Sequence, residues 1–156
     1  MPETLYIDGR WVSAAAGGTR EIRCPADGSL VAVVDEADDT DTVRAIAAAR
    51  AAFDRGEWAG TPMPERGALL LRVAAALRER KEEFAEAESR DTGKRIVESR
   101  IDMDDIAACF EYYGRLAGND AGRIVDAGSA DVLSRVVYEP VGVCAAFAPW
   151  NFPAIT

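Results

Sequence analysis

Histidine is missing from these 156 residues. Its absence excludes, within this sequence, the Ser-His-Asp and Cys-His arrangements that activate a nucleophile and the HExxH zinc site of metalloproteases. A general base must therefore be Asp, Glu, Lys or Tyr, or it must lie outside these residues.

Cysteine is scarce, and the three are Cys24, Cys109 and Cys144. The number is odd and no pair has CxxC spacing, which argues against a disulfide framework and against a zinc site. We expect Cys109 and Cys144 to be buried, because a free cysteine packs as a small hydrophobe. Free thiols suit a reducing compartment, and the start MPETLYIDGRW lacks the apolar stretch of a secretory signal. The expected location is cytoplasmic.

Positive charge is in deficit, since 18 Lys and Arg face 27 Asp and Glu, for a net charge of −9. This balance argues against a nucleic-acid partner, which requires a basic patch. Long hydrophobic runs are also missing. Residues 140–156 carry no charge, but Pro140, Pro149 and Pro153 interrupt them and the stretch is too short to span a bilayer well. We therefore expect no membrane association.

The sequence opens with two β-hairpin patterns. In LYIDGRWV (5–12), the pair Asp8-Gly9 supplies the positive φ angles of a type I′ turn. Residues 19–24 and 29–34 flank a second turn at 25–28.

Three helical patterns follow. The first carries apolar residues at a helical period behind Asp38, Asp39 and Asp41, whose charges suit the positive end of a helix dipole. The second runs from after Pro64 to near Gly93, a plausible C-cap. The third bears Ile101, Ile106, Cys109, Phe110, Tyr113 and Leu116 and ends near Gly118.

The last part reads as strands. Residues 123–140 predict two strands around a Gly-Ser turn, and these could be solvated or could pair with another strand. VGVCAAFA (141–148) is continuously apolar, which is typical of a strand covered on both faces in a parallel sheet.

Several other motifs favour structural explanations. The acidic clusters 35–41 and 102–105 indicate helix-end electrostatics and a solvated face. The first lacks the Gly and the bidentate Glu of an EF-hand calcium loop, and the second lies in a helical pattern. DTGK (91–94) lacks the residues of a phosphate-binding loop. Glycines 114, 118 and 122 have small-xxx-small spacing but polar surroundings, which indicates loose turns and helix ends.

APWNFP (148–153) is the strongest candidate for chemistry. Its prolines fix the backbone directly after the predicted strand, and Asn151 lies between them. An amide held at the carboxyl end of a parallel strand can donate to a developing oxyanion. From the residues alone, an asparagine that caps local backbone explains the motif equally well.

The stretch EPVGVCAAFAPWNFP (139–153) resembles the start of the cofactor-binding strand in the NAD(P)-dependent aldehyde dehydrogenase superfamily. YIDGRWV, CPADG (24–28), RDTGK and EYYGRLAG (111–118) follow the family's order and rough spacing. The resemblance covers essentially the whole sequence. In its general features the sequence is similar to the betaine- and amino-aldehyde branch, although Phe152 stands where many members of that branch have Tyr.

The resemblance implies an α/β fold, the N-terminal part of an aldehyde-dehydrogenase-like structure with β-hairpins, three helices, arm strands and a first Rossmann-type strand. Residues 1–122 would belong to the cofactor-binding domain. Residues 123–140 would form the oligomerisation arm that pairs subunits into dimers or tetramers. Residues 141–156 would be the first strand and turn of the Rossmann-type fold, truncated there.

The resemblance also implies roles for individual residues. Asn151 would be the oxyanion-hole donor to the aldehyde oxygen. Four residues would line the NAD or NADP cofactor, largely through their backbone: Phe147, Ala148, Pro149 and Trp150. Asp91 falls where some members bind a structural monovalent cation.

The implied activity is oxidation of a small-molecule aldehyde to a carboxylic acid with NAD(P)+, through a thiohemiacetal on a cysteine. None of the three cysteines here occupies the nucleophile's place. We therefore expect an N-terminal fragment of an oxidoreductase that is inactive alone and unstable or prone to aggregation. Two alternatives stay open: a naturally short, non-catalytic interaction module that pairs with full-length subunits, and an acidic α/β binding domain without chemistry.

Overall fold

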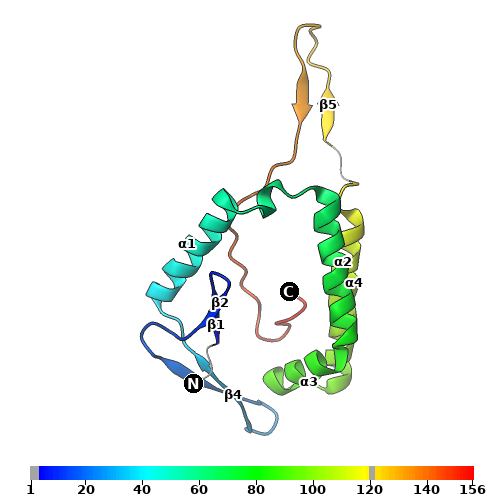
Figure 1. Cartoon of the computed structure of the whole chain (residues 1–156). Coiled ribbons are helices and arrows are strands. Elements are labelled where there is room, and N and C mark those ends of the chain that lie inside the picture. Colours follow the sequence, from blue (N-terminus) through cyan, green and yellow to red (C-terminus); the bar gives the residue numbers. More distant parts are fainter. Residues whose placement is uncertain (1–3, 120–121) are drawn as a thin grey trace.

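A computed structural model describes residues 4–119 and 122–156. Within these residues the chain forms α-helices, one short 3-10 helix and three two-stranded antiparallel sheets, each of which is a hairpin. Figure 1 shows α1 and the first two hairpins on one side and α2, α3 and α4 on the other. The chain's final segment runs between these two parts. No helix within the described ranges is both long enough and apolar enough to cross a membrane.

Both N-terminal hairpins form as predicted. Strands β1 (Leu5–Ile7) and β2 (Arg10–Val12) pair around Asp8 and Gly9, whose φ angles are 54° and 75°. These positive values are those of the predicted type I′ turn. Strands β3 (Thr19–Arg23) and β4 (Leu30–Asp35) form the second hairpin.

Helix α1 (Asp39–Arg55) begins at Asp38, whose carboxylate accepts hydrogen bonds from the backbone N–H of Thr40 and Asp41 at 2.8 and 3.1 Å. The predicted helix-end role of the acidic cluster 35–41 is confirmed for Asp38. The solvated role is wrong for Asp35 and Asp41, which are buried. Their carboxylates accept the backbone N–H groups of residues 14 and 15 and so attach the segment that follows the first hairpin to β4 and α1.

The predicted second helix is in fact two helices. A 3-10 turn, η1 (Trp58–Gly60), leads into α2 (Met63–Glu79), and α3 (Lys81–Thr92) follows a break at Arg80. The break turns α3 across the ends of α2 and α4, where Ala85 is fully buried (Figure 1). Gly93 ends α3 with a φ of 74°, which confirms the predicted C-cap.

Helix α4 (Ile96–Leu116) packs along α2 and confirms the predicted third helix. The core between α2, α3 and α4 consists of Ala85, Met103 and Ile106, with Ile155 from the end of the chain packed against it. Cys109 is exposed, so its predicted burial is wrong. It lies on α4 beside Phe110 in an open apolar pocket and not in the core.

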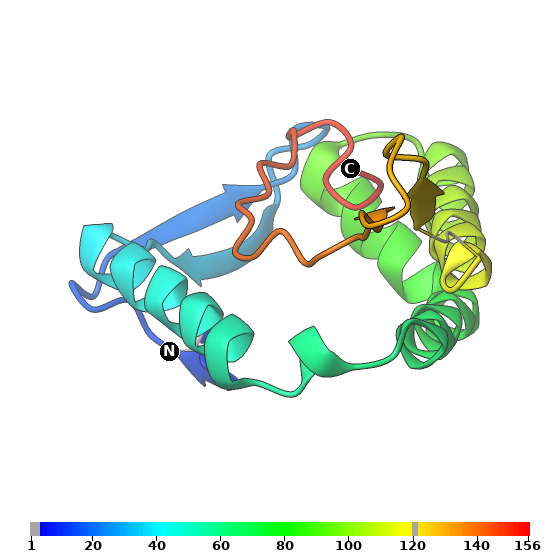
Figure 2. The same cartoon turned by 90° about the horizontal axis from the view of Figure 1, so that it is seen from above.

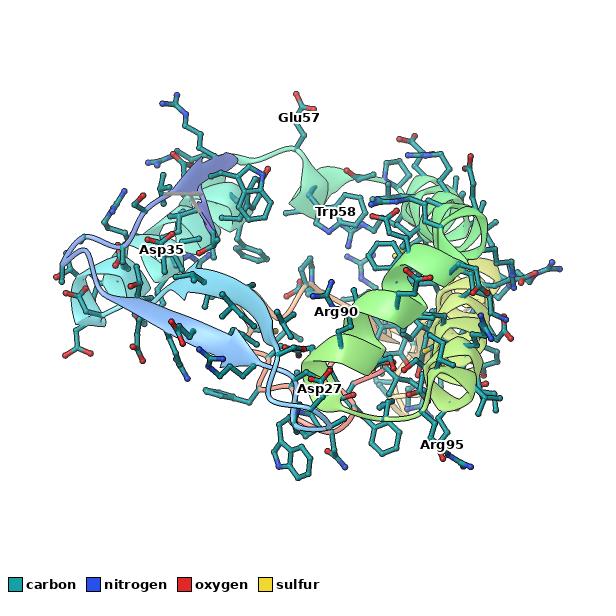
Figure 3. All side chains as sticks on the ribbon, turned by 90° about the horizontal axis from the view of Figure 1, so that it is seen from below. Asp27, Asp35, Glu57, Trp58, Arg90 and Arg95 are labelled. Atoms are coloured by element: carbon teal, nitrogen blue, oxygen red, sulfur yellow. The ribbon has the colours of Figure 1, made fainter. Side chains whose placement is uncertain are left out.

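The turn at residues 25–28 packs against the end of α3 and so connects the β3–β4 hairpin with the helices. A Cβ on Gly93 would lie 3.2 Å from the Ala26 nitrogen. Asp27 in this turn and Arg90 on α3 lie where the two parts meet (Figure 3). The hydrogen bond from the Ser29 backbone, with a smaller contribution from the Arg90 charge, lowers the pKa of Asp27.

Strands β5 (Arg123–Val125) and β6 (Ser134–Val136) form the third predicted hairpin, which projects away from the rest of the molecule (Figure 1). Residues 141–149 then return toward the helices without regular secondary structure. The predicted burial of Cys144 is wrong, because no strand of the described residues pairs with this segment and covers it. The place of residues 141–148 in a parallel sheet stays a prediction.

Candidate functional site

The site is built around the turn at residues 150–155, which follows the irregular segment 141–149. Inside the turn, the Phe152 carbonyl accepts a hydrogen bond of 2.7 Å from the Thr156 hydroxyl. Pro149 and Pro153 bracket the turn and restrict its backbone. Ile155 packs against the core between α3 and α4, so the turn is attached to these helices (Figure 2).

Asn151 is exposed and lies on the wall of a cavity of about 390 Å³. The other lining residues are Lys94, Glu98, Ile101, Asp102 and Phe152. The structure therefore places the predicted oxyanion donor beside charged groups from the α3–α4 junction that the sequence analysis did not select. An exposed amide on the wall of a cavity is free to donate to a ligand oxygen.

Lys94 is the centre of a buried cluster of charges. Its side chain is 13% exposed, and its Nζ lies 2.6 Å from Asp102 Oδ2 and 3.5 Å from Glu88 Oε1. The same Nζ lies 4.4 Å from the centroid of the Phe152 ring, which is a cation–π contact. Glu88, Lys94, Asp102 and Phe152 thus join α3, α4 and the terminal turn at one point.

The cluster contains two carboxylates for one ammonium. Burial raises the pKa of Glu88 and outweighs the opposing effect of the Lys94 charge. Burial also acts to lower the pKa of Lys94, but the hydrogen bond to Asp102 and the two negative charges outweigh it, so the pKa of Lys94 is raised. Lys94 therefore stays charged beneath the Phe152 ring.

The sequence analysis missed this cluster because it explained Gly93 as a cap and the acidic stretch 102–105 as solvated. That interpretation is wrong for Asp102, which is buried. The sequence did contain one indication of the cluster. Glu88 follows Phe84 by four residues and so falls on the apolar face of its helix. A carboxylate on such a face requires a partner, and Lys94 is the nearest lysine along the chain.

The four predicted cofactor-lining residues are not gathered around the cavity of Asn151. Phe147, Ala148, Pro149 and Trp150 are all exposed, and Phe147 and Trp150 keep 94% and 83% of their surface. They lie in order along the segment that leads into the turn. Their apolar surfaces and the backbone between them are open to a ligand.

Asp91 is exposed near the end of α3 and lines a hollow that it shares with Glu88 and Pro153. In the part of the chain that the structure describes, no group of three or more His, Cys, Asp or Glu side chains could hold a metal ion. The assignment of Asp91 to a monovalent cation stays a prediction.

Comparisons with known proteins identify the family to which this fold belongs. The model of the aldehyde dehydrogenase family matches residues 11–156. The chain is 46% identical over 155 residues to betaine aldehyde dehydrogenase of Bacillus subtilis, covering 99% of this chain and 32% of that protein. It is 36% identical over 155 residues to an aldehyde dehydrogenase of Aspergillus niger, covering 99% and 31%.

A solved structure shares the fold. Betaine aldehyde dehydrogenase of Staphylococcus aureus, in complex with NAD+, superimposes with a TM-score of 0.95 at 40% identity. The match covers 98% of this chain and 30% of that one. The chain thus spans about a third of the length of the relatives that it matches. The matched residues, the identities and the shared fold show that this chain belongs to the aldehyde dehydrogenase family.

Proposed function

We propose that this chain is part of an enzyme that oxidises an aldehyde to a carboxylic acid with NAD+ or NADP+, and that Asn151 is its oxyanion donor. The observation that carries the proposal is the position of the Asn151 amide on the wall of a cavity, on a turn attached to α3 and α4. Betaine aldehyde is the proposed substrate, because relatives at 46% and 40% identity bear that name.

Asn151 would act on the oxygen of the aldehyde. When a nucleophile attacks the carbonyl carbon, negative charge develops on this oxygen, and the side-chain amide can donate a hydrogen bond to it. A donor aimed in advance stabilises the transition state more than the ground state, because the oxygen is a better acceptor once it is charged. The nucleophile itself is not assigned to this chain.

The exposed segment before Asn151 fits a planar cofactor ring. Phe147 and Trp150 offer aromatic surface, and no strand of the described residues occupies the backbone of 147–150. These four residues would hold the nicotinamide end of the cofactor by contact with side chains and backbone. When bound, the nicotinamide supplies the acceptor for the hydride that leaves the substrate carbon.

Assembly into a homo-oligomer through the β5–β6 arm is part of the proposal. The hairpin projects from the molecule (Figure 1), and Ile124 and Leu133 on it keep 81% and 74% of their surface. Exposed apolar side chains and unpaired strand edges on a projecting hairpin favour pairing with another subunit.

The test replaces Asn151 by alanine in the full-length protein that the gene encodes, with betaine aldehyde and NAD+ as substrates. We expect kcat to fall by about 100- to 1,000-fold, as for the loss of one oxyanion donor, while the KM for NAD+ changes little. Asn119→Ala is the matched control, because Asn119 donates to the Arg115 carbonyl at the end of α4, outside the cavity. Unchanged turnover in Asn151→Ala would contradict the assignment.

A further inference from the structure

Two features of the structure meet at the Phe152 side chain. The turn that presents Asn151 continues directly into Phe152, and the Phe152 ring lies over the ammonium of Lys94 at 4.4 Å. Lys94 is far from the turn in sequence and belongs to the junction between α3 and α4. Its contact with the ring is therefore a tertiary connection between these helices and the turn.

We propose that Lys94 is a positioning residue for Asn151 and acts through the Phe152 ring. The inference rests on the proposed role of Asn151 as oxyanion donor. It adds to that role a buried ammonium that fixes the direction of the donor through an aromatic ring.

Lys94 is suited to this role because its own position is fixed from two sides. Asp102 on α4 binds the ammonium at 2.6 Å, and Glu88 on α3 lies at 3.5 Å. A lysine on the surface has a mobile head group, but this side chain is 13% exposed and held between two helices. The cation is thus held in one position, and its attraction for the aromatic ring holds Phe152 in position as well.

The turn requires such a contact at its Asn151 end. Its other end is fixed by Ile155 in the core, and the Thr156 hydroxyl donates to the Phe152 carbonyl, a bond that holds neither the Phe152 ring nor the Asn151 side chain. The Phe152 side chain remains 43% exposed, and apolar packing alone holds it weakly. Loss of the cation frees the ring and with it the peptide that carries Asn151. A displacement near 1 Å at a reacting centre is enough to cost about 100-fold in rate.

The experiment is a double-mutant cycle in the full-length enzyme, with Lys94→Met, Phe152→Leu and the combination. We expect Lys94→Met to lower kcat by about 10-fold or more with little change in the KM for NAD+. In the Phe152→Leu background, the same lysine replacement should lower kcat by less than about 2-fold, because its effect passes through the ring. Lys94→Arg keeps a positive charge that can lie against the ring and should therefore lower kcat less than Lys94→Met does.

Lys81→Met is the matched control. Lys81 Nζ also lies 2.6 Å from an aspartate of α4, Asp104, but Lys81 does not line the cavity that holds Asn151. Its replacement should leave kcat unchanged. If Lys94→Met is unfolded because Asp102 is left unpaired, the pair Lys94→Gln with Asp102→Asn removes the cation without leaving that buried charge, and it takes the place of Lys94→Met in the cycle.

The outcomes separate this inference from the proposed function. Effects of Lys94 and Phe152 on kcat that add independently would overturn the positioning role while the enzyme stays active. Wild-type turnover in a folded variant without the cation would overturn it as well. A wild-type enzyme that oxidises no aldehyde with NAD+ or NADP+ would instead overturn the proposed function and this inference with it.

Discussion

The tight crossing of α2 and α4 predicts that alanine at Gly67 destabilises the protein. A Cβ at this position would lie 2.5 Å from the Gly114 carbonyl oxygen and 3.0 Å from the Ala117 Cβ. The first distance is too short for a carbon and a backbone oxygen, so the two helices must separate. Gly67 and Gly114 are both buried at this crossing, and the added methyl group has no open space to enter.

The magnitude follows from two opposing effects. Overpacking that shifts the backbone costs about 1–3 kcal/mol of unfolding free energy. Alanine is a better helix former than glycine in the middle of a helix by about 1 kcal/mol, which offsets part of that cost. The expected net loss is about 1–2 kcal/mol. Because α4 also carries Asp102, its displacement should reach the Lys94 cluster and lower kcat together with stability.

The assay is thermal or urea unfolding of the full-length protein followed by intrinsic fluorescence. Gly60→Ala is the control, because nothing lies within 4 Å of a Cβ added in η1 and its φ is not positive. We expect the midpoint to fall for Gly67→Ala and to stay the same or rise for Gly60→Ala. An unchanged midpoint in Gly67→Ala would refute the close helix crossing.

Two further predictions concern charge and assembly. The folded-state pKa of Glu88 is raised by burial, so the folded protein loses stability as pH rises from the ordinary Glu value of 4.5 through the raised pKa. Glu88→Gln should therefore melt at a higher temperature than wild type at pH 8, with the difference shrinking toward pH 4; equal melting at both pH values would contradict this. Ile124→Lys should convert oligomers to smaller species in sedimentation velocity, whereas Ser129→Lys, at the exposed tip of the same hairpin, should not; an intact oligomer in Ile124→Lys would show that the arm is not the interface.

The parts of the fold that follow from neighbouring residues could be predicted from the sequence. Asp8-Gly9 requires positive φ angles, Asp38 caps the first turn of α1, and Gly93 takes the left-handed conformation at the end of α3. Each of these features depends on a few residues along the chain. These hairpin turns and helix ends were therefore predictable.

Features that depend on distant residues were not predictable in the same way. The break at Arg80 has no glycine or proline to mark it, and it exists because α3 gains contacts with α4, among them Lys81 with Asp104. Gly114 was interpreted as part of a loose turn, but it lies buried inside α4, where the absence of a side chain allows α2 to approach closely. Nothing local to either position shows the helix that packs against it.

In the candidate site too, the feature set by neighbouring residues could be predicted, and the features set by distant residues could not. Two prolines around Asn151 marked the donor itself, because their effect on the backbone is local. The groups that would fix the donor's direction come from three separate segments, and only the fold brings Glu88, Lys94 and Asp102 beneath Phe152. A single exposed amide can point in many directions, and a catalytic donor requires one. The precision of Asn151 therefore depends on the cluster that α3 and α4 hold beneath Phe152, so that substitutions of Lys94 or Asp102 should change kcat, whereas an ion pair of the same helices away from the turn, such as Lys81 with Asp104, should not matter for it.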